Sequence, residues 1–255
     1  DSAFHIKNIM KIALLGYGKM GRIIEQFALD RGHEIVLKIT SANQEDLNAE
    51  RLRQADVAID FSTPGTVLGN IEACFEADVP VVVGTTGWYA KLQEVKDRCV
   101  ERNKSLLYGS NFSIGVNVFF HVNKILARIM NRYPQYDVLV EEIHHTQKLD
   151  APSGTAITIA EGILDGLDRK GEWVGELVGD NQEVIPRADQ LLIESHRLED
   201  VPGTHTVIYS SEVDDIEFKH KAHSRAGFAL GAVVAAEWLQ GRQGFYSVKD
   251  IFDFN

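Results

Sequence analysis

Two adjacent histidines and a nearby lysine precede a Pro-Ser-Gly-Thr segment in this chain: His144, His145 and Lys148, then residues 152–155. Imidazole titrates near neutral pH, so it can donate or accept a proton under working conditions. An ammonium stabilises negative charge that develops in a transition state. The segment at 152–155 is typical of a helix start, where unpaired backbone N–H groups attract anions. The block could therefore hold a small anion and pass it a proton. The alternative is a polar strand end followed by an ordinary helix cap.

A glycine-rich turn near the N-terminus is the second chemical feature. The apolar run at residues 11–15 has the length of a buried parallel strand, and it leads into a Gly-x-Gly-x-x-Gly pattern. Apolar residues at helical spacing follow over residues 20–28. This order is typical of a dinucleotide-binding fingerprint, although a glycine turn without a ligand is the alternative. The expected cofactor contacts are Gly16, Tyr17, Gly18, Lys19, Met20 and Gly21.

The second expected strand bears on the choice between NADH and NADPH. Such fingerprints usually carry an acidic residue about 20 positions on, which holds the adenosine ribose hydroxyls. Here the strand at residues 34–40 contains Lys38, and its end at Thr40 and Ser41 has no carboxylate. Lys38 or this polar end could accommodate a 2′-phosphate, which favours NADPH slightly. If strand alternation turns Lys38 away from the cofactor, it is only a solvated charge.

Composition and charge argue against several kinds of partner. The net charge of −11 disfavours nucleic acid, because phosphate binding needs a basic surface. No apolar run reaches the ~18 residues of a membrane span. Neither Cys74 nor Cys99 lies in a cluster with metal-ligand spacing, so we expect no metal and a reduced, cytoplasmic protein. Residues 1–9 precede Met10, which we interpret as the native start, and we expect them to be an extension left by cloning.

Strand-like and helix-like segments alternate through the first half of the chain. Further strands are expected at residues 55–62, 79–83 and 105–108, with helices at about 67–77 and 89–102 between them. Such alternation indicates a parallel sheet with helices on both faces, which binds ligands at the carboxyl ends of its strands. Two of these ends lead into further candidate cofactor contacts, namely Gly84, Thr85, Thr86, Gly109, Ser110, Asn111 and Phe112.

The second half of the chain has a different order of elements. A long helix at about residues 114–131 precedes an apolar strand, residues 136–140, that leads to the two histidines. Three strand-like runs come later without helices between them, which indicates an antiparallel or mixed sheet in a separate α+β domain. These runs are residues 190–194, 206–209 and 217–220. Residues 228–239 are almost wholly apolar, so we expect a buried helix that packs on the nucleotide-binding domain.

Four of these segments together resemble the 4-hydroxy-tetrahydrodipicolinate reductases, over nearly the whole chain from Met10 onward. They are the glycine-rich turn, Gly84-Thr85-Thr86-Gly87, residues 111–117 and residues 142–156. The resemblance implies NAD(P)H-dependent reduction of 4-hydroxy-tetrahydrodipicolinate, via dihydrodipicolinate, to tetrahydrodipicolinate in the diaminopimelate route to lysine.

The resemblance also implies an α/β fold with two domains. Residues 10–111 and 226–255 would form a Rossmann-type dinucleotide-binding domain. Residues 112–225 would form an inserted α+β domain, built on a mixed sheet, that binds substrate and assembles a homotetramer.

Carried over by position, the resemblance assigns roles to single residues. His144 would donate or accept the proton, with Lys148 as its catalytic partner. His145, Gly154 and Thr155 would hold the carboxylates of a small dicarboxylate substrate, together with the helix start at Ser153. The nicotinamide side of the cofactor would meet Gly84, Thr85, Thr86 and residues 109–112. Ser153 lacks a visible base, so we expect a helix cap rather than a nucleophile.

The remaining histidines and two other function classes stay open at this point. His220 and Arg225 lie in a segment similar to the family's H-K-A-x-S-R run and could border the site, but a solvated or structural role is favoured for them and for His196, His205 and His223. A different Rossmann reductase of a small amino or imino acid would keep the glycine-rich turn. A non-enzymatic NAD(P)-binding redox sensor would need no proton donor, so His144 and Lys148 count against it.

Overall fold

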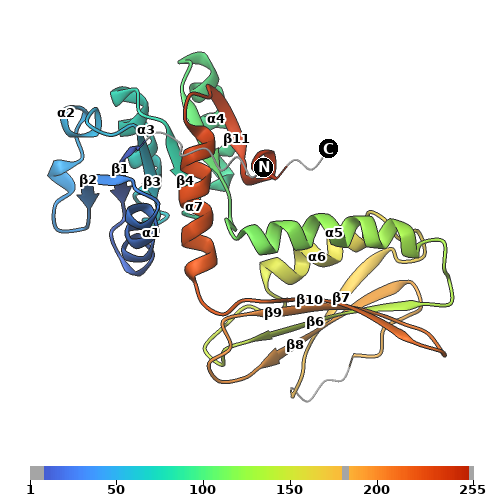
Figure 1. The fold of residues 1–255 in the computed structure, drawn as a ribbon. Coiled ribbons are helices and arrows are strands. Elements are labelled where there is room, and N and C mark those ends of the chain that lie inside the picture. The colour runs from blue at the N-terminus through green and yellow to red at the C-terminus, as the bar shows by residue number, and fades with distance from the viewer. Residues whose placement is uncertain (1–8, 180–183, 253–255) are drawn as a thin grey trace, which may run out of the picture. The chain divides into compact units, whose positions relative to one another are not determined.

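The chain divides into two compact units in the computed structural model, which describes residues 9–179 and 184–252 (Figure 1). Unit 1 comprises the chain up to Ile114 and from Ala226 onward, and unit 2 comprises Gly115–Arg225. Of the expected extension at residues 1–9, only Ile9 lies within the described residues, and residues 253–255 lie outside them.

Unit 1 is built on a six-stranded parallel sheet with the order β11-β5-β4-β3-β1-β2. Its strands are β1 (Lys11–Leu15), β2 (Glu34–Ile39), β3 (Val57–Asp60), β4 (Val81–Val83), β5 (Ser105–Tyr108) and β11 (Gly244–Ser247). Its helices are α1 (Lys19–Asp30), α2 (Ala49–Leu52), α3 (Val67–Ala77), α4 (Leu92–Glu101), α7 (Ala226–Leu239) and α8 (Val248–Ile251), with 3-10 turns η1 (Gln44–Asp46) and η2 (Tyr89–Lys91).

Alternate side chains of the buried strands separate two cores on the two faces of this sheet. Ala13 and Leu15 of β1 pack into one core with α3 and α4, whereas Ile12 and Leu14 pack into the other with α1 and α7. Helix α7 lies against α1 and is apolar almost throughout, as its buried position requires. The expected parallel sheet with helices on both faces is therefore confirmed.

Unit 2 is a five-stranded mixed sheet covered on one face by α5 (Ile114–Met130) and α6 (Gly154–Leu164) (Figure 1). The sheet order is β10-β9-β6-β8-β7, in which β10, β9 and β6 are antiparallel neighbours and β6, β8 and β7 are parallel. The strands are β6 (Asp137–His144), β7 (Glu172–Leu177), β8 (Gln190–Arg197), β9 (Thr204–Ser210) and β10 (Asp215–Lys221). The expected mixed sheet is confirmed.

Several elements were not expected from the sequence, and each lacks a periodic pattern. Strands β7 and β11 contain glycine and no regular alternation of apolar residues, and α2 and α8 span only four residues each. Gly175 in β7 is explained by packing, since a Cβ there would lie 2.7 Å from Pro152 Cγ. Strand β6 continues to His144, so the first histidine lies on the sheet.

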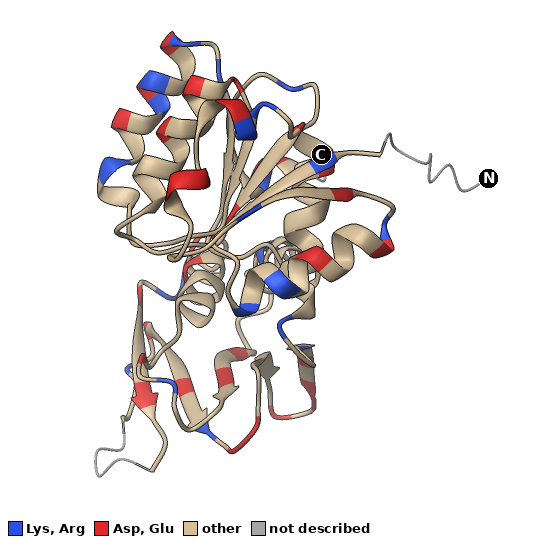
Figure 2. Ribbon diagram, turned by 90° about the vertical axis from the view of Figure 1, so that its left-hand side faces the viewer, with Lys and Arg blue, Asp and Glu red and all other residues tan. Residues whose placement is uncertain are grey.

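Charged residues of both signs are interspersed along the elements of both units (Figure 2). Within the described ranges, no helix is long and apolar enough to cross a membrane.

Candidate active site

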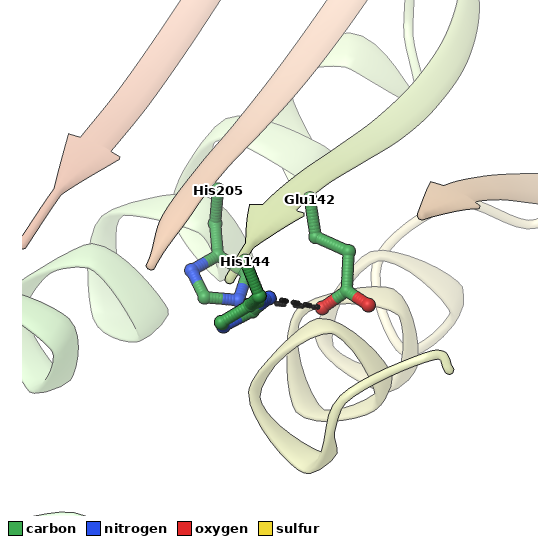
Figure 3. Close-up of side chains that lie close together, drawn as sticks. All are labelled: Glu142, His144 and His205. Atoms are coloured by element: carbon green, nitrogen blue, oxygen red, sulfur yellow. Dashed lines mark ion pairs between the residues drawn. The ribbon is translucent and has the colours of Figure 1, made fainter. Parts of the chain in front are cut away.

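The first histidine of the His-His block ends strand β6 and faces the helix-covered side of the unit 2 sheet. Burial alternates along β6, so Val138, Val140, Glu142 and His144 point inward. The buried Glu142 carboxylate lies below the N-terminus of α6, and His205 reaches it from β9 (Figure 3). The strand pattern thus brings a carboxylate and two imidazoles together.

The two oxygens of Glu142 have different partners. Oε1 accepts hydrogen bonds from the Ser153 backbone N–H at 3.0 Å and from Ser195 Oγ at 2.8 Å. Oε2 lies 3.4 Å from His144 Nδ1 and 3.7 Å from His205 Nε2. Buried carboxylates stay ionised only where such donors surround them.

These residues form part of one polar row across adjacent strands. Glu142 is in register with Ser195 of β8 on one side and with His205 of β9 on the other, and His205 is in register with His220 of β10. Side chains in register on neighbouring strands stand side by side on one face. Register therefore places His220 next to His205, whereas Arg225 follows β10 and is exposed.

Burial and neighbouring charges shift the pKa values of the two central groups. Burial disfavours ionisation of Glu142, but hydrogen bonds from His205, Ser153 and Ser195 lower its pKa to about 2. Burial, together with the nearby His205, Lys148 and Arg197, lowers the pKa of His144 to about 4, although Glu142 opposes the shift. In the free protein at neutral pH, His144 is therefore neutral and Glu142 is ionised.

The loop after β6 holds Lys148 beside an acidic partner. Lys148 Nζ donates to Asp150 Oδ1 at 2.7 Å and Oδ2 at 2.8 Å, which lowers the pKa of Asp150. Arg197 of β8 fixes this loop because it donates to the carbonyl oxygens of Lys148 and Asp150. The Asp150 side chain is 60% exposed, so an incoming anion can compete with it for the ammonium.

Helix α6 begins as expected, with Ser153 as its N-cap. Ser153 Oγ accepts from the Ala156 N–H at 3.2 Å and lies 3.3 Å from His205 Nε2, so the expected cap is confirmed. The first helical N–H groups, those of Gly154 and Thr155, have no hydrogen bond to any described residue. A Cβ on Gly154 would meet nothing within 4 Å. This helix start is thus open to a carboxylate.

His145 follows the end of β6 and is half-buried. Its Nδ1 is buried and has no hydrogen-bond partner among the described residues. This ring nitrogen can therefore still form a hydrogen bond with a ligand.

In unit 1, the three glycines of the fingerprint differ in what surrounds them. Gly16 has a φ of +93°, and a Cβ there would lie 2.3 Å from the Phe61 carbonyl oxygen. A Cβ on Gly21 would lie 2.6 Å from the Gly16 carbonyl oxygen, whereas one on Gly18 would meet nothing within 4 Å. Gly16 and Gly21 thus permit tight packing, and Gly18 leaves space where a pyrophosphate can approach the backbone of the α1 N-terminus.

Lys38 lies beside Tyr17 of this turn. Its Nζ lies 4.8 Å from the centre of the Tyr17 ring and 2.5 Å from Glu25 Oε1, and the Tyr17 hydroxyl donates to the same Glu25 carboxylate. The Glu25 interaction raises the pKa of Lys38. By contrast, the Thr40 hydroxyl donates to Asn43 Oδ1 at 2.8 Å and helps to close its own turn.

The other candidate cofactor residues lie at the ends of β4 and β5. Thr85 is buried, and its hydroxyl donates to Asp60 Oδ1 at 2.5 Å and accepts from the Ser62 N–H. Burial raises the pKa of Asp60, while hydrogen bonds from Thr85, Asn70 and Ser62 oppose that shift. The Thr85 side chain therefore fixes the loops after β3 and β4.

The remaining members of that set differ in exposure. Thr86 and Ser110 are exposed, and a Cβ on Gly84 would lie 2.2 Å from the Phe61 ring. The Phe112 ring is buried in the core shared with α7. Asn111 Oδ1 accepts from the Ser113 N–H at 2.9 Å.

Three site residues were not predicted from the sequence: Glu142, Ser195 and Arg197. For His205, a solvated or structural role was favoured. Their one signal is the alternation along β6, β8 and β9, and it becomes useful only once register is known. The structure also forms two His-and-carboxylate groups that could hold a metal, Glu142–His144–His205 and Glu141–Glu194–His196. The absence of a metal at both groups stays our prediction.

Comparison with known families matches almost the whole chain. Residues 10–112 match the family model described as dihydrodipicolinate reductase, N-terminus. Residues 115–252 match the model described as dihydrodipicolinate reductase, C-terminus.

Individual relatives agree with these matches. A 4-hydroxy-tetrahydrodipicolinate reductase of Christiangramia forsetii is 48% identical over 95% of this chain and 97% of its own length. One from Neisseria gonorrhoeae is 33% identical over 96% of this chain and 98% of its own length. Among solved structures, dipicolinate-bound dihydrodipicolinate reductase from Paenisporosarcina sp. TG-14 has a TM-score of 0.76 at 22% identity, over 96% of this chain and 100% of that chain, which supports the fold.

Proposed function

This chain belongs to the dihydrodipicolinate reductase family, and from that premise we propose that it reduces 4-hydroxy-tetrahydrodipicolinate, via dihydrodipicolinate, to tetrahydrodipicolinate with NAD(P)H. The observation that carries the proposal is the convergence in unit 2 of His144, Lys148 and the open N-terminus of α6. The reaction belongs to diaminopimelate and lysine biosynthesis.

The chemistry of the substrate requires these groups. Loss of water from the hydroxylated cyclic imine leaves an electron-poor ring that bears two carboxylates. NAD(P)H, when bound, supplies the hydride. Negative charge develops toward the ring nitrogen, where a proton from His144 neutralises it and the Lys148 ammonium stabilises it.

The two carboxylates are held by groups that the structure leaves available. The free N–H groups of Gly154 and Thr155 donate hydrogen bonds to one carboxylate at the positive end of the α6 dipole, with Ser153 fixing the helix start. His145 offers an unpartnered ring nitrogen. The bound dianion competes with Asp150 for Lys148.

The cofactor is held by unit 1, whose residues fit a dinucleotide. The turn of residues 16–21 cradles the pyrophosphate, because the space beside Gly18 is open. Residues 84–86 and 109–112 line the nicotinamide side, with Thr85 and Phe112 contributing backbone rather than free side chains. Lys38 lies beside Tyr17 and favours NADPH over NADH, though Glu25 reduces that preference.

We also infer the assembly and location of the enzyme. The uncovered face of the unit 2 sheet supports a homotetramer joined through this unit. Cys74 and Cys99 are both buried free thiols, which supports a cytoplasmic enzyme with no need for nucleic acid or membrane partners.

The proposed reaction is tested by mixing the protein with freshly generated substrate and NADPH or NADH, and following loss of nicotinamide absorbance. We expect oxidation with at least one cofactor. His144→Gln should lower turnover by about 10²-fold with little change in cofactor affinity, because it removes the proton donor alone. No oxidation by the wild-type protein would reject the proposed function and favour a reductase of another imino acid. Unchanged turnover in His144→Gln would reject only the role of that residue.

A further inference from the structure

We propose that Glu142 is a positioning residue for proton transfer, because one carboxylate fixes both the His144 ring and the first turn of α6. The inference rests on the proposed function, since it explains how His144 and the α6 N-terminus are held to perform it. Glu142 contacts neither the carboxylate-binding N–H groups nor the accessible side of His144, so it acts through them.

The two Glu142 oxygens contact different groups, and each contact fixes a different part of the site. Oε1 accepts from Ser153 N and Ser195 Oγ and so ties α6 to β6 and β8. Oε2 lies 3.4 Å from His144 Nδ1 and 3.7 Å from His205 Nε2, and neither Oε2 nor His144 Nδ1 has a closer polar partner among the described residues (Figure 3). A buried acceptor and a buried ring nitrogen that face each other call for a proton between them.

This arrangement selects the tautomer of His144. An ionised carboxylate only accepts hydrogen bonds, so His144 Nδ1 carries the proton and Nε2 is left for the substrate. Nε2 lies beside Gly203, where a Cβ would be 3.1 Å away. The missing side chain of Gly203 keeps that ring edge clear. When His144 is protonated, Nε2–H becomes the donor and Glu142 faces the resulting cation.

Among the described groups with the largest effect on His144, Glu142 favours the protonated ring and the others oppose it. The groups that face it are Glu142 on β6, His205 on β9, Arg197 on β8 and Lys148 in the following loop. All except Glu142 oppose protonation, as burial does. A bound dicarboxylate neutralises the cations, so substrate binding raises the proton affinity of His144 with Glu142 as the fixed counter-charge.

The same carboxylate sets the distance between the proton donor and the anion site. Ser153 N–H is held by Glu142, and the next two N–H groups, those of Gly154 and Thr155, begin the open helix turn. A shift of α6 relative to β6 would break this hydrogen bond. Such coupling of two functional elements through a buried residue is how a site keeps its geometry.

Glu142→Gln isolates the proton-related part of this role. Gln has nearly the same shape, and its carbonyl oxygen can still accept from Ser153 and Ser195. Its NH₂ group would replace Oε2 and donate to His144 Nδ1, which moves the ring proton to Nε2 and removes the counter-charge. The matched control is Glu141→Gln. Glu141 precedes Glu142 on β6, its side chain is 28% exposed, and strand alternation places it on the other face of the sheet.

We expect Glu142→Gln to lower kcat by about 10²-fold while KM for NADPH stays unchanged, and Glu141→Gln to behave as wild type. The pH limb of kcat that reports protonated His144 should move to lower pH. Binding of pyridine-2,6-dicarboxylate, measured by calorimetry in buffers of different ionisation enthalpy, should take up fewer protons than in the wild type. Glu142→Asp keeps the charge and should give intermediate values.

Unchanged kcat, pH limb and proton uptake in a folded Glu142→Gln protein would overturn the inference. If Glu142→Gln does not fold, Glu142→Asp tests the inference instead. A pH limb of kcat in Glu142→Asp identical to that of the wild type would also overturn the inference. Inactive wild-type and Glu141→Gln proteins would instead reject the proposed function. The proton uptake on dicarboxylate binding would then still test whether Glu142 governs His144.

Discussion

Lys38 is paired with a residue of helix α1 and also lies beside the turn that we propose to bind the cofactor. Its ammonium faces Tyr17 of the glycine-rich turn, yet it is paired with Glu25 of α1. A 2′-phosphate carries about two negative charges and would compete with the single charge of Glu25. The proposed cofactor preference would therefore depend on Lys38, which favours NADPH, and on Glu25, which reduces that preference.

We predict that Lys38→Ala weakens NADPH binding by about tenfold and leaves NADH binding nearly unchanged, because a charge-assisted contact to the 2′-phosphate is lost. Glu25→Gln should tighten NADPH binding, since it frees the ammonium. Fluorescence titration of both cofactors measures the effect, with Lys96→Ala on the exposed side of α4 as the control. Equal weakening of NADH and NADPH by Lys38→Ala would contradict a role in cofactor choice.

Local motifs revealed the site residues whose partners are close in sequence. His144, Lys148 and the Ser153 cap stand within one short block, so their types and spacing could be interpreted directly. Ser195 and His205 lie far along the chain and reach Glu142 only through strand pairing. Pairing depends on the whole sheet, and a shift by one residue would turn each of them to the other face.

At the scale of the elements, the row Ser195–Glu142–His205 joins three strands beneath α6. It replaces apolar packing with a hydrogen-bonded carboxylate that must stay ionised. Both Glu142 and His144 have lowered pKa values in the folded protein, about 2 and about 4. The unfolded chain therefore binds more protons than the folded one as the pH falls, first at His144 and then at Glu142.

Because the unfolded chain binds more protons, we predict that the free energy of unfolding decreases as the pH falls from about 6.5 toward 4, a range in which His144 is protonated only in the unfolded chain. The free energy of unfolding decreases further below about 4.5, where Glu142 contributes in the same way. In His144→Gln, the loss between pH 7.5 and pH 5 should be smaller than in the wild type. Urea unfolding at the two pH values measures it, with the exposed His223→Gln as the control. An equal acid loss in wild type and His144→Gln would show that His144 is not responsible.

The strength of each periodic pattern determined which elements were predictable. The β-α alternation of unit 1 and the long helix α5 have clear periods, and α3 and β5 begin and end at the expected residues. Strands β7 and β11 have no such period, since each is positioned by a neighbour, β8 and β5 respectively. Tertiary pairing can impose a strand where local preference is weak.

At the scale of the whole molecule, the described helices of unit 2 cover only one face of its sheet. Several of the side chains that alternate with the helix-facing ones are apolar and only partly buried. They include Leu139, Ile143, Leu192 and Ile208. An apolar sheet face is usually covered in a stable assembly, and a closed homotetramer would cover it with copies of itself.

We therefore predict that light scattering finds four chains of 28.4 kDa in one particle, and that Ile208→Asp breaks it into smaller species because a buried charge at this face is costly. The control is Ile125→Asp on α5, a helix position that is 44% exposed and lies on the opposite side of the sheet. It should leave the particle intact. A monomeric wild type, or dissociation by Ile125→Asp instead of Ile208→Asp, would place the assembly surface elsewhere. Cofactor binding by the dissociated variant should persist, since the residues proposed to hold it lie in unit 1.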